Sequence, residues 1–300
     1  MPDLSFHEIS ELRASRPQAI AEALASRRRR PLLAPGGRLL LIAADHPARG
    51  ALGVRDRVNA MADRRDLLER MVAALDRPGV DGVLGTADVL EDLLLLGALE
   101  DKVVIGSMNR GGLQGASFEL DDRFTGYDAG SIAAAGFNGG KMLCRIDLQD
   151  MGTVETLEAC ARAVSELAHH ELMAMVEPFM SQRAEGRVRN ELTADAVVKS
   201  VAIASGLGTT SAFTWLKIPV VDDMERVMTS TTLPTLLLGG DPSGAPEDTY
   251  RTWGKALAQP GVRGLVVGRA LLYPPDGNVA VAVDAAARLV RVSSAAELAS

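Results

Sequence analysis

The sequence predicts an α/β fold, a (β/α)8 TIM barrel over residues 38–300 with an N-terminal helical extension over residues 1–37. Three observations support this prediction. Short apolar runs alternate with helical patterns, the alternation repeats eight times, and its length of roughly 250 residues matches a barrel of this type. The strands are nearly continuous apolar runs, as expected of parallel strands buried on both faces, and no Gly-x-Gly-x-x-Gly follows the first strand to favour a doubly wound dinucleotide fold.

The extension is expected to be helical over residues 5–30, with Ser15 as a candidate N-cap and Pro17 in the first turn. Four arginines, Arg27–Arg30, then stand where cations complement the helix dipole. We interpret them as a solvated helix end in preference to a targeting or anion-binding motif.

The barrel elements follow in order. The expected strands are Leu39–Ala44, Gly82–Gly85, Val103–Met108, Gly139–Ile146, Leu172–Glu177, Ala212–Ile218, Thr235–Gly239 and Gly264–Val267. The helical patterns that separate and follow them cover residues 59–76, 87–98, 126–135, 153–169, 192–205, 222–229, 246–258 and 277–292.

Composition limits the function classes. With 47% hydrophobic and 24% charged residues among 300, the chain is expected to be a globular protein with a substantial core. A net charge of -7 provides no general field for attracting nucleic acid. Cys144 and Cys160 are the two cysteines, no secretory leader is evident, and no apolar run reaches the length of a membrane span, so we expect a cytoplasmic location without membrane contact.

Lysine is scarce, because five lysines stand against 27 arginines among the 32 basic residues. A barrel enzyme places its site at the carboxyl ends of the strands, so strand position selects candidate residues. Two of the lysines, Lys141 and Lys217, fall inside predicted strands, where a buried ammonium is costly. The other polar residues that this criterion selects are Asp45, His46, Asn109, Arg110, Arg145, Asp147 and Glu177.

Lys217 lies between Leu216 and Ile218, late in its strand. An apolar setting with a second cation nearby lowers the pKa of an amine and produces the neutral nucleophile that forms a Schiff base with a carbonyl. The alternative is an amine that only pairs with Glu177. By strand alternation, Lys141 shares a face with Arg145 and lies opposite Cys144, so it either contributes to a cationic patch or pairs with Asp147.

Two carboxylates, Asp45 and Glu177, are candidates for general acid and base, or for counter-ions of the lysines. His46 follows Asp45 and is either a loop histidine or a substrate contact.

Glycines follow the last two strands, at Gly239-Gly240 and at Gly268, which precedes Arg269. Loops in these positions commonly bind phosphate in barrels, because glycine lets backbone amides approach an anion and an arginine adds a charge-assisted bond. Glycine is also ordinary in such turns.

No metal site or cofactor is expected. Apart from His46, the histidines are His7 and the adjacent His169 and His170, whose side chains point apart on a helix. We find no Walker loop, no Gly-x-Ser-x-Gly motif and no Cys-x-x-Cys.

The order of these motifs resembles the class I aldolases of the DeoC/LacD/DhnA type over about residues 38–290. The segments that carry the resemblance are Leu41–His46, Lys141–Leu143, Val176–Pro178, Leu216–Ile218, Leu238–Gly240 and Gly264–Arg269. The resemblance implies that Lys217 forms the Schiff base, that Asp45 assists proton transfer, and that Gly240, Gly268 and Arg269 hold phosphate.

Two further features narrow the resemblance. Lys141 and Glu177 resemble the tagatose-bisphosphate aldolase branch, which places both residues beside the imine. Arg145 and the loop after Asn109 look like an actinobacterial subgroup associated with myo-inositol breakdown. Where many members read Asp-His-Gly, this chain has His46 followed by Pro47.

The subgroup implies a substrate, 2-deoxy-5-keto-gluconate 6-phosphate, cleaved to dihydroxyacetone phosphate and malonate semialdehyde. Arg110 or Arg145 is then expected to bind its carboxylate. Fructose or tagatose bisphosphate, deoxyribose 5-phosphate, and a non-catalytic phosphosugar-binding barrel remain alternatives. The expected partners are the phosphosugar and further copies of the chain in a homo-oligomer.

Overall fold

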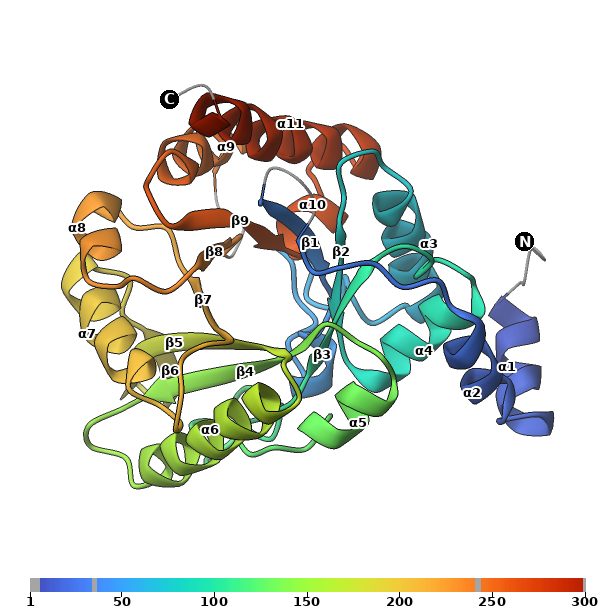
Figure 1. The fold of residues 1–300 in the computed structure, drawn as a ribbon, viewed down its shortest axis with the longest axis horizontal. Helices are drawn as coiled ribbons and strands as arrows, with labels where there is room; N and C mark the ends of the chain where they lie inside the picture. The colour runs from blue at the N-terminus through green and yellow to red at the C-terminus, as the bar shows by residue number, and fades with distance from the viewer. Residues whose placement is uncertain (1–5, 34–36, 241–243, 299–300) are drawn as a thin grey trace.

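The computed structural model describes residues 6–33, 37–240 and 244–298, which form a closed parallel barrel surrounded by helices (Figure 1). The strands follow the order β4-β3-β2-β1-β9-β8-β7-β5, and an additional pairing of β4 with β5 closes the ring. Every pairing within this ring is parallel. The prediction of a (β/α)8 TIM barrel is confirmed.

The strands of the ring agree with the predicted ones to within a few residues, with one exception described below. They are β1 (Leu39–Ala43), β2 (Gly82–Gly85), β3 (Val103–Ser107), β4 (Gly139–Ile146), β5 (Met173–Ala184), β7 (Thr214–Ile218), β8 (Thr235–Leu238) and β9 (Val262–Val267).

The helices cover the outside of the ring (Figure 1). They are α3 (Arg64–Leu75), α4 (Ala87–Leu95), α5 (Ala129–Ala134), α6 (Gly152–His169), α7 (Ala194–Ser205), α8 (Met224–Thr229), α9 (Pro246–Leu257) and α11 (Val279–Leu298). Two short helices lie in loops at the carboxyl ends of strands, the 3-10 helix η1 (Pro47–Arg49) after β1 and α10 (Arg269–Leu272) after β9.

Side-chain alternation along each strand creates two apolar layers. In β1, Leu39 and Leu41 pack inside the barrel, whereas Leu40 and Ile42 pack against the helices. The same alternation places Cys144 in the outer layer, as predicted, opposite the face that carries Lys141.

The N-terminal extension differs from the single helix that we predicted. It forms α1 (Phe6–Ser15) and α2 (Ala19–Ser26), which lie beside α4 outside the barrel (Figure 1). The break falls at Pro17, which lacks the N–H that a continuous helix requires. Ser15 is therefore not an N-cap, and its hydroxyl donates to the carbonyl of Glu11.

The prediction of a solvated arginine run holds for Arg28 and Arg29, which are exposed, but it is wrong for Arg27. Arg27 is 5% exposed, and its guanidinium donates to the carbonyls of Leu99, Lys102 and Gly136. Arg30 forms an ion pair with Asp81. These bonds attach the extension to the end of the barrel where the strands begin.

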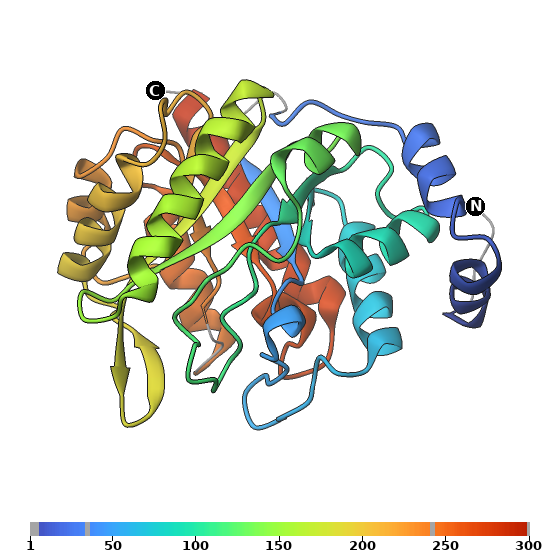
Figure 2. The ribbon, with the colours of Figure 1, turned by 90° about the horizontal axis from the view of Figure 1, so that it is seen from below.

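The fifth barrel strand is longer than predicted. β5 continues beyond Glu177 to Ala184 and pairs with an antiparallel strand, β6 (Arg187–Asn190). This hairpin projects from the carboxyl ends of the barrel strands (Figure 2). Its polar, arginine-rich sequence does not show the apolar run by which we recognised strands.

Candidate active site

A cavity of about 630 Å³ opens where the barrel strands end, and residues from β1, β3, β4, β5, β7, β8 and β9 or the loops that follow them line it. It brings together the sequence-predicted residues from both halves of the chain. Those that line the cavity are Asp45, His46, Arg110, Arg145, Glu177, Lys217, Gly239, Gly240, Gly268 and Arg269. Lys141 is fully buried beneath them.

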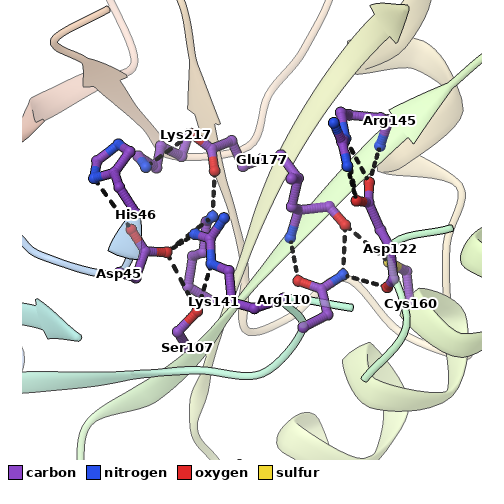
Figure 3. Close-up of polar contacts among 12 residues, drawn as sticks. Asp45, His46, Ser107, Arg110, Asp122, Lys141, Arg145, Cys160, Glu177 and Lys217 are labelled. Carbon is purple, nitrogen blue, oxygen red and sulfur yellow. Dashed lines mark hydrogen bonds and ion pairs between the residues drawn. The ribbon is translucent and has the colours of Figure 1, made fainter. Parts of the chain in front are cut away.

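Both lysines contact one carboxylate, that of Glu177 (Figure 3). Nζ of Lys217 lies 2.8 Å from Oε1 of Glu177, and Nζ of Lys141 binds Oε2. Strand alternation directs all three side chains toward the barrel axis, because each occupies an inward position on its strand. The carboxylate therefore holds two amines from different strands beside each other.

Asp45 anchors the other side of this cluster. Its Oδ2 contacts the guanidinium of Arg110, lies 3.3 Å from Nζ of Lys141, and accepts a hydrogen bond of 3.2 Å from the hydroxyl of Ser107. Oδ1 of Asp45 is buried without a hydrogen-bond partner among the described residues. Asp45 thus holds Lys141 through one oxygen, while the other is buried beside His46 without a hydrogen bond.

Burial and neighbouring charge shift the pKa values of this cluster. Burial lowers the pKa of Lys217, and the charge of Arg110 adds to that effect, while Glu177 opposes it. The pKa of Lys141 lies well below its usual range through burial, and the charges of Arg110 and Lys217 lower it further. Burial alone raises the pKa of Glu177, but Lys141, Lys217 and Arg110 together hold it well below its usual range. An ionised carboxylate therefore stands beside amines that lose their protons readily.

Access distinguishes the two amines. Lys217 lines the cavity, whereas Lys141 has no exposed surface. A carbonyl compound bound in the cavity therefore meets Lys217 first, and Lys141 lies behind the carboxylate.

A second polar network lies on the β3 and β4 side of the mouth, and sequence reasoning identified only part of it. The guanidinium of Arg145 binds Asp122 through Nε and Nη2, and its Nη1 lies 3.5 Å from Oε1 of Glu119. Arg49 reaches the same Glu119 oxygen from η1, at 3.8 Å. Asn109 joins this region by bonding the backbone of Leu143 in both directions.

Across the two networks, four residues were not predicted as site residues: Arg49, Ser107, Glu119 and Asp122. Glu119 and Asp122 lie within the loop between β3 and α5, where no periodicity marks an inward side chain. The only available signal was their charge. Lys141 does not pair with Asp147, which was the alternative to a role in a cationic patch: Lys141 contacts Asp45 and Glu177, and Asp147 accepts backbone N–H groups of Gln149 and Arg183.

His46 lines the cavity beside Asp45, with Nδ1 3.8 Å from Oδ1 of Asp45. Burial, together with the charges of Arg269 and Lys217, lowers its pKa well below the usual range. The imidazole is therefore neutral at physiological pH, and its buried Nδ1 has no hydrogen-bond partner among the described residues.

Glycine is required after β8 and after β9 for different structural reasons. A side chain at Gly268 would collide with the carbonyl of Ala43, so this glycine is required by close packing of β9 against β1. Gly240 has a φ of +66° and open space around it, which leaves its backbone accessible in the cavity. Arg269 lies at the same end and donates a hydrogen bond to the carbonyl of Gly53.

The fold and this cluster define a class of protein, a (β/α)8 barrel with a buried lysine–carboxylate site at the carboxyl ends of its strands. The chain belongs to the Cgl0159-like family, whose model matches residues 37–287. A crystal structure of Cgl0159 from Corynebacterium glutamicum is 58% identical to it, with a TM-score of 0.94 over 97% of this chain and 98% of that chain.

More distant solved structures share the fold. A Schiff-base-forming fructose-1,6-bisphosphate aldolase is 20% identical, with a TM-score of 0.63 over 90% of this chain and 99% of that chain. An archaeal fructose-1,6-bisphosphate aldolase, solved with its catalytic lysine bound to the carbinolamine intermediate, is 19% identical, with a TM-score of 0.62 over the same shares. No curated protein matches the chain.

Among the described residues, none of the helices is sufficiently long and apolar to span a membrane.

Proposed function

We propose that this protein is a class I aldolase that cleaves a phosphorylated keto-sugar acid through a Schiff base on Lys217. The observation that carries the proposal is the position of Lys217, which lines the cavity while bonded to an ionised carboxylate and surrounded by a buried cationic cluster. The barrel it shares with Schiff-base aldolases supports the same chemistry. By resemblance to the subgroup associated with inositol breakdown, we propose 2-deoxy-5-keto-gluconate 6-phosphate as the substrate.

The first stage is addition of the neutral Lys217 amine to the ketone. Loss of water from the resulting carbinolamine gives an iminium ion, which is an electron acceptor. Glu177 bonds Lys217 before the reaction, so it stands where a proton must be received. Burial and the charge of Arg110 both lower the pKa of Lys217, and this favours its neutral amine.

The second stage is carbon–carbon cleavage. Glu177 accepts the proton of the hydroxyl group two carbons away from the iminium carbon, the bond between the intervening carbon and the hydroxyl-bearing carbon breaks, and its electron pair moves to the iminium nitrogen to give an enamine. The hydroxyl-bearing fragment leaves as malonate semialdehyde. Protonation of the enamine and hydrolysis by water then release dihydroxyacetone phosphate and the free amine.

We assign the remaining residues as follows. Asp45 holds Lys141 and Arg110, and its free Oδ1 is placed for a second proton transfer or for a substrate hydroxyl. Gly239, Gly240, Gly268 and Arg269 form the phosphate end of the cavity. His46, neutral and with an unpartnered Nδ1, contacts a substrate hydroxyl.

Borohydride trapping tests the proposal. With dihydroxyacetone phosphate and borohydride, the wild-type protein is expected to gain the mass of one reduced adduct, which peptide mapping places on Lys217. Lys217→Arg, which retains the charge but not a neutral amine, is expected to lose the adduct and to lower cleavage by roughly 10⁴-fold or more. Lys199→Arg, outside the site, serves as the control.

An unchanged wild-type mass, with phosphosugar still bound, would instead support the non-catalytic binding barrel. Cleavage assays on fructose bisphosphate, tagatose bisphosphate and deoxyribose 5-phosphate then separate the alternative substrates. A higher kcat/KM on any of these than on the keto-sugar acid would overturn the proposed substrate.

A further inference from the structure

We infer that Arg49 is the specificity-determining residue of the cavity and that it binds a carboxylate at the end of the substrate remote from the phosphate. This inference rests on the proposed function for the identity of the substrate's phosphate end. It reassigns the carboxylate-binding role, for which the sequence suggested Arg110 or Arg145.

Barrel topology separates two ends of the cavity. In the closed order of eight strands, β3 and β4 lie directly across the ring from β8 and β9. The glycines and Arg269 follow β8 and β9. Arg49 extends from η1 toward the opposite side, where it meets Glu119 of the loop between β3 and α5. A linear substrate whose phosphate lies against Gly240 therefore directs its other end toward Arg49, with Lys217 between them.

The other arginines on this side of the cavity are already engaged. Arg110 binds Asp45 and Ser107, and its side chain is 7% exposed. Arg145 binds Asp122 through two nitrogen atoms, and its side chain is 3% exposed. Recruiting either of them for substrate would remove an ion pair from a buried carboxylate, Asp45 or Asp122, which costs free energy.

Arg49 is different in its contacts and its access. Its side chain is 21% exposed and lines the cavity. Among the described residues its ion pair is with Glu119, at 3.8 Å, and its buried Nη1 has no hydrogen-bond partner there. Burial and the charge of Arg145 lower the pKa of Arg49, while Asp122, Glu119 and Glu177 oppose this effect. A guanidinium of this kind gains a charge-assisted bond when an anion arrives.

Local charge favours a carboxylate over a phosphate. Among the described residues at this end, Arg49 and Arg145 are balanced by Glu119 and Asp122, and Arg110 is paired with Asp45, so each arginine stands beside a carboxylate before substrate binds. A monoanion adds one negative charge and meets the one arginine with unused donors. A phosphate dianion adds roughly twice that charge beside two carboxylates, without further free donors to compensate it. The geometry therefore selects a phosphorylated sugar acid over a sugar bisphosphate.

Equilibrium binding tests this inference without requiring catalysis. Three open-chain six-carbon ligands without a ketone, 6-phosphogluconate, glucitol 6-phosphate and glucitol 1,6-bisphosphate, present a carboxylate, a neutral group and a phosphate at the remote end. For the wild-type protein, titration calorimetry is expected to give the lowest Kd for 6-phosphogluconate. Arg49→Gln is expected to raise that Kd roughly 10- to 100-fold and to change the Kd of glucitol 6-phosphate by less than about twofold.

Arg189→Gln is the control variant, because Arg189 lies on the exposed hairpin and its ion pair within the described part of the chain is with Glu185. If Arg49→Gln does not fold, Arg49→Lys tests the same point, since it retains the charge but not the planar fork. Equal weakening of 6-phosphogluconate and glucitol 6-phosphate would overturn the inference and make Arg49 structural. Tightest binding of the bisphosphate, lost in Arg49→Gln, would overturn the choice of carboxylate.

The outcomes also separate this inference from the proposed function. Absence of a borohydride adduct on Lys217, with selective loss of 6-phosphogluconate binding in Arg49→Gln, would contradict the aldolase proposal alone. An adduct on Lys217 with no selectivity at Arg49 would contradict the subsite alone.

Discussion

The two ends of the barrel both bury arginine side chains, but these side chains bind different kinds of partner. Where the strands begin, Arg27 donates to three backbone carbonyls and Arg38 donates to the carbonyl of Leu257. Where the strands end, Arg110 and Arg145 bind carboxylates that also contact other charged groups. Figure 2 shows both ends, with the N-terminal helices and the β5–β6 hairpin lying on different parts of the molecule.

The difference shows how one residue type can stabilise the fold at one end and, in the proposed function, adjust the pKa of two amines at the other. Backbone carbonyls do not titrate, so the bonds of Arg27 stay the same over a wide range of pH. At the mouth, three cations, Lys141, Lys217 and Arg110, share the carboxylates of Asp45 and Glu177. With all three protonated, the cluster has one positive charge in excess. This excess lowers the pKa of the amines and favours the loss of a proton from one of them.

The largest change is expected from removing the carboxylate that joins the two amines. Glu177→Gln is expected to lower kcat by roughly 10²- to 10⁴-fold, since the proton acceptor is lost. Its charge and hydrogen bond raise the pKa of Lys217 in the wild type, so their removal lowers that pKa further. Borohydride trapping measures the rate of adduct formation as a function of pH. The acidic limb of this profile, where the rate falls because the amine is protonated, should then move to lower pH.

The control for this variant is Glu185→Gln, on the exposed hairpin, which should leave both readouts unchanged. A shift of the acidic limb to higher pH would contradict the charge balance described for the mouth.

Arg110→Gln is expected to have an effect of intermediate size, and to move the acidic limb of adduct formation in the opposite direction from Glu177→Gln. The charge of Arg110 lowers the pKa of both Lys141 and Lys217, so its removal raises them and the acidic limb moves to higher pH. A pKa change of about one unit reduces the neutral amine at pH 7 by about tenfold, and trapping slows accordingly.

Arg110→Lys keeps the positive charge and should retain most of the wild-type pH profile. If both variants shift the acidic limb equally, the geometry of Arg110, and not its charge, controls the pKa of the amines.

The smallest catalytic effect is expected at the other end of the barrel. Arg27→Ala leaves three carbonyls without their donor and is expected to lower the free energy of unfolding by about 2–3 kcal/mol, measured by denaturant titration, with kcat unchanged. The neighbouring Arg28→Ala is the matched control, because that side chain is 64% exposed in its pairs with Glu100 and Asp101, and its removal should change the free energy of unfolding much less. A fall in kcat for Arg27→Ala would contradict the conclusion that this end of the barrel contributes to stability and not to catalysis.

Much of the barrel and of its central cluster follows from the sequence. The eightfold alternation determines the architecture, and strand periodicity places Lys141, Glu177 and Lys217 on inward faces before any contact is known. This information is local, because a period of two residues specifies which side of a strand a residue occupies. The inner position of two lysines in a chain with few of them was therefore visible in the sequence.

The partners of these side chains were decided only by the tertiary structure. Arg145 binds Asp122, 23 residues earlier in the chain, instead of the nearby Asp147, and Arg27 binds carbonyls of loops 72 to 109 residues away. Loops have no repeating pattern that fixes side-chain direction, so their contributions to the mouth, Arg49 and Glu119 among them, depend on how the closed ring brings its connections together. The sequence by itself determined which residues face inward, and closure of the barrel determined which charges meet and which amine reaches the cavity.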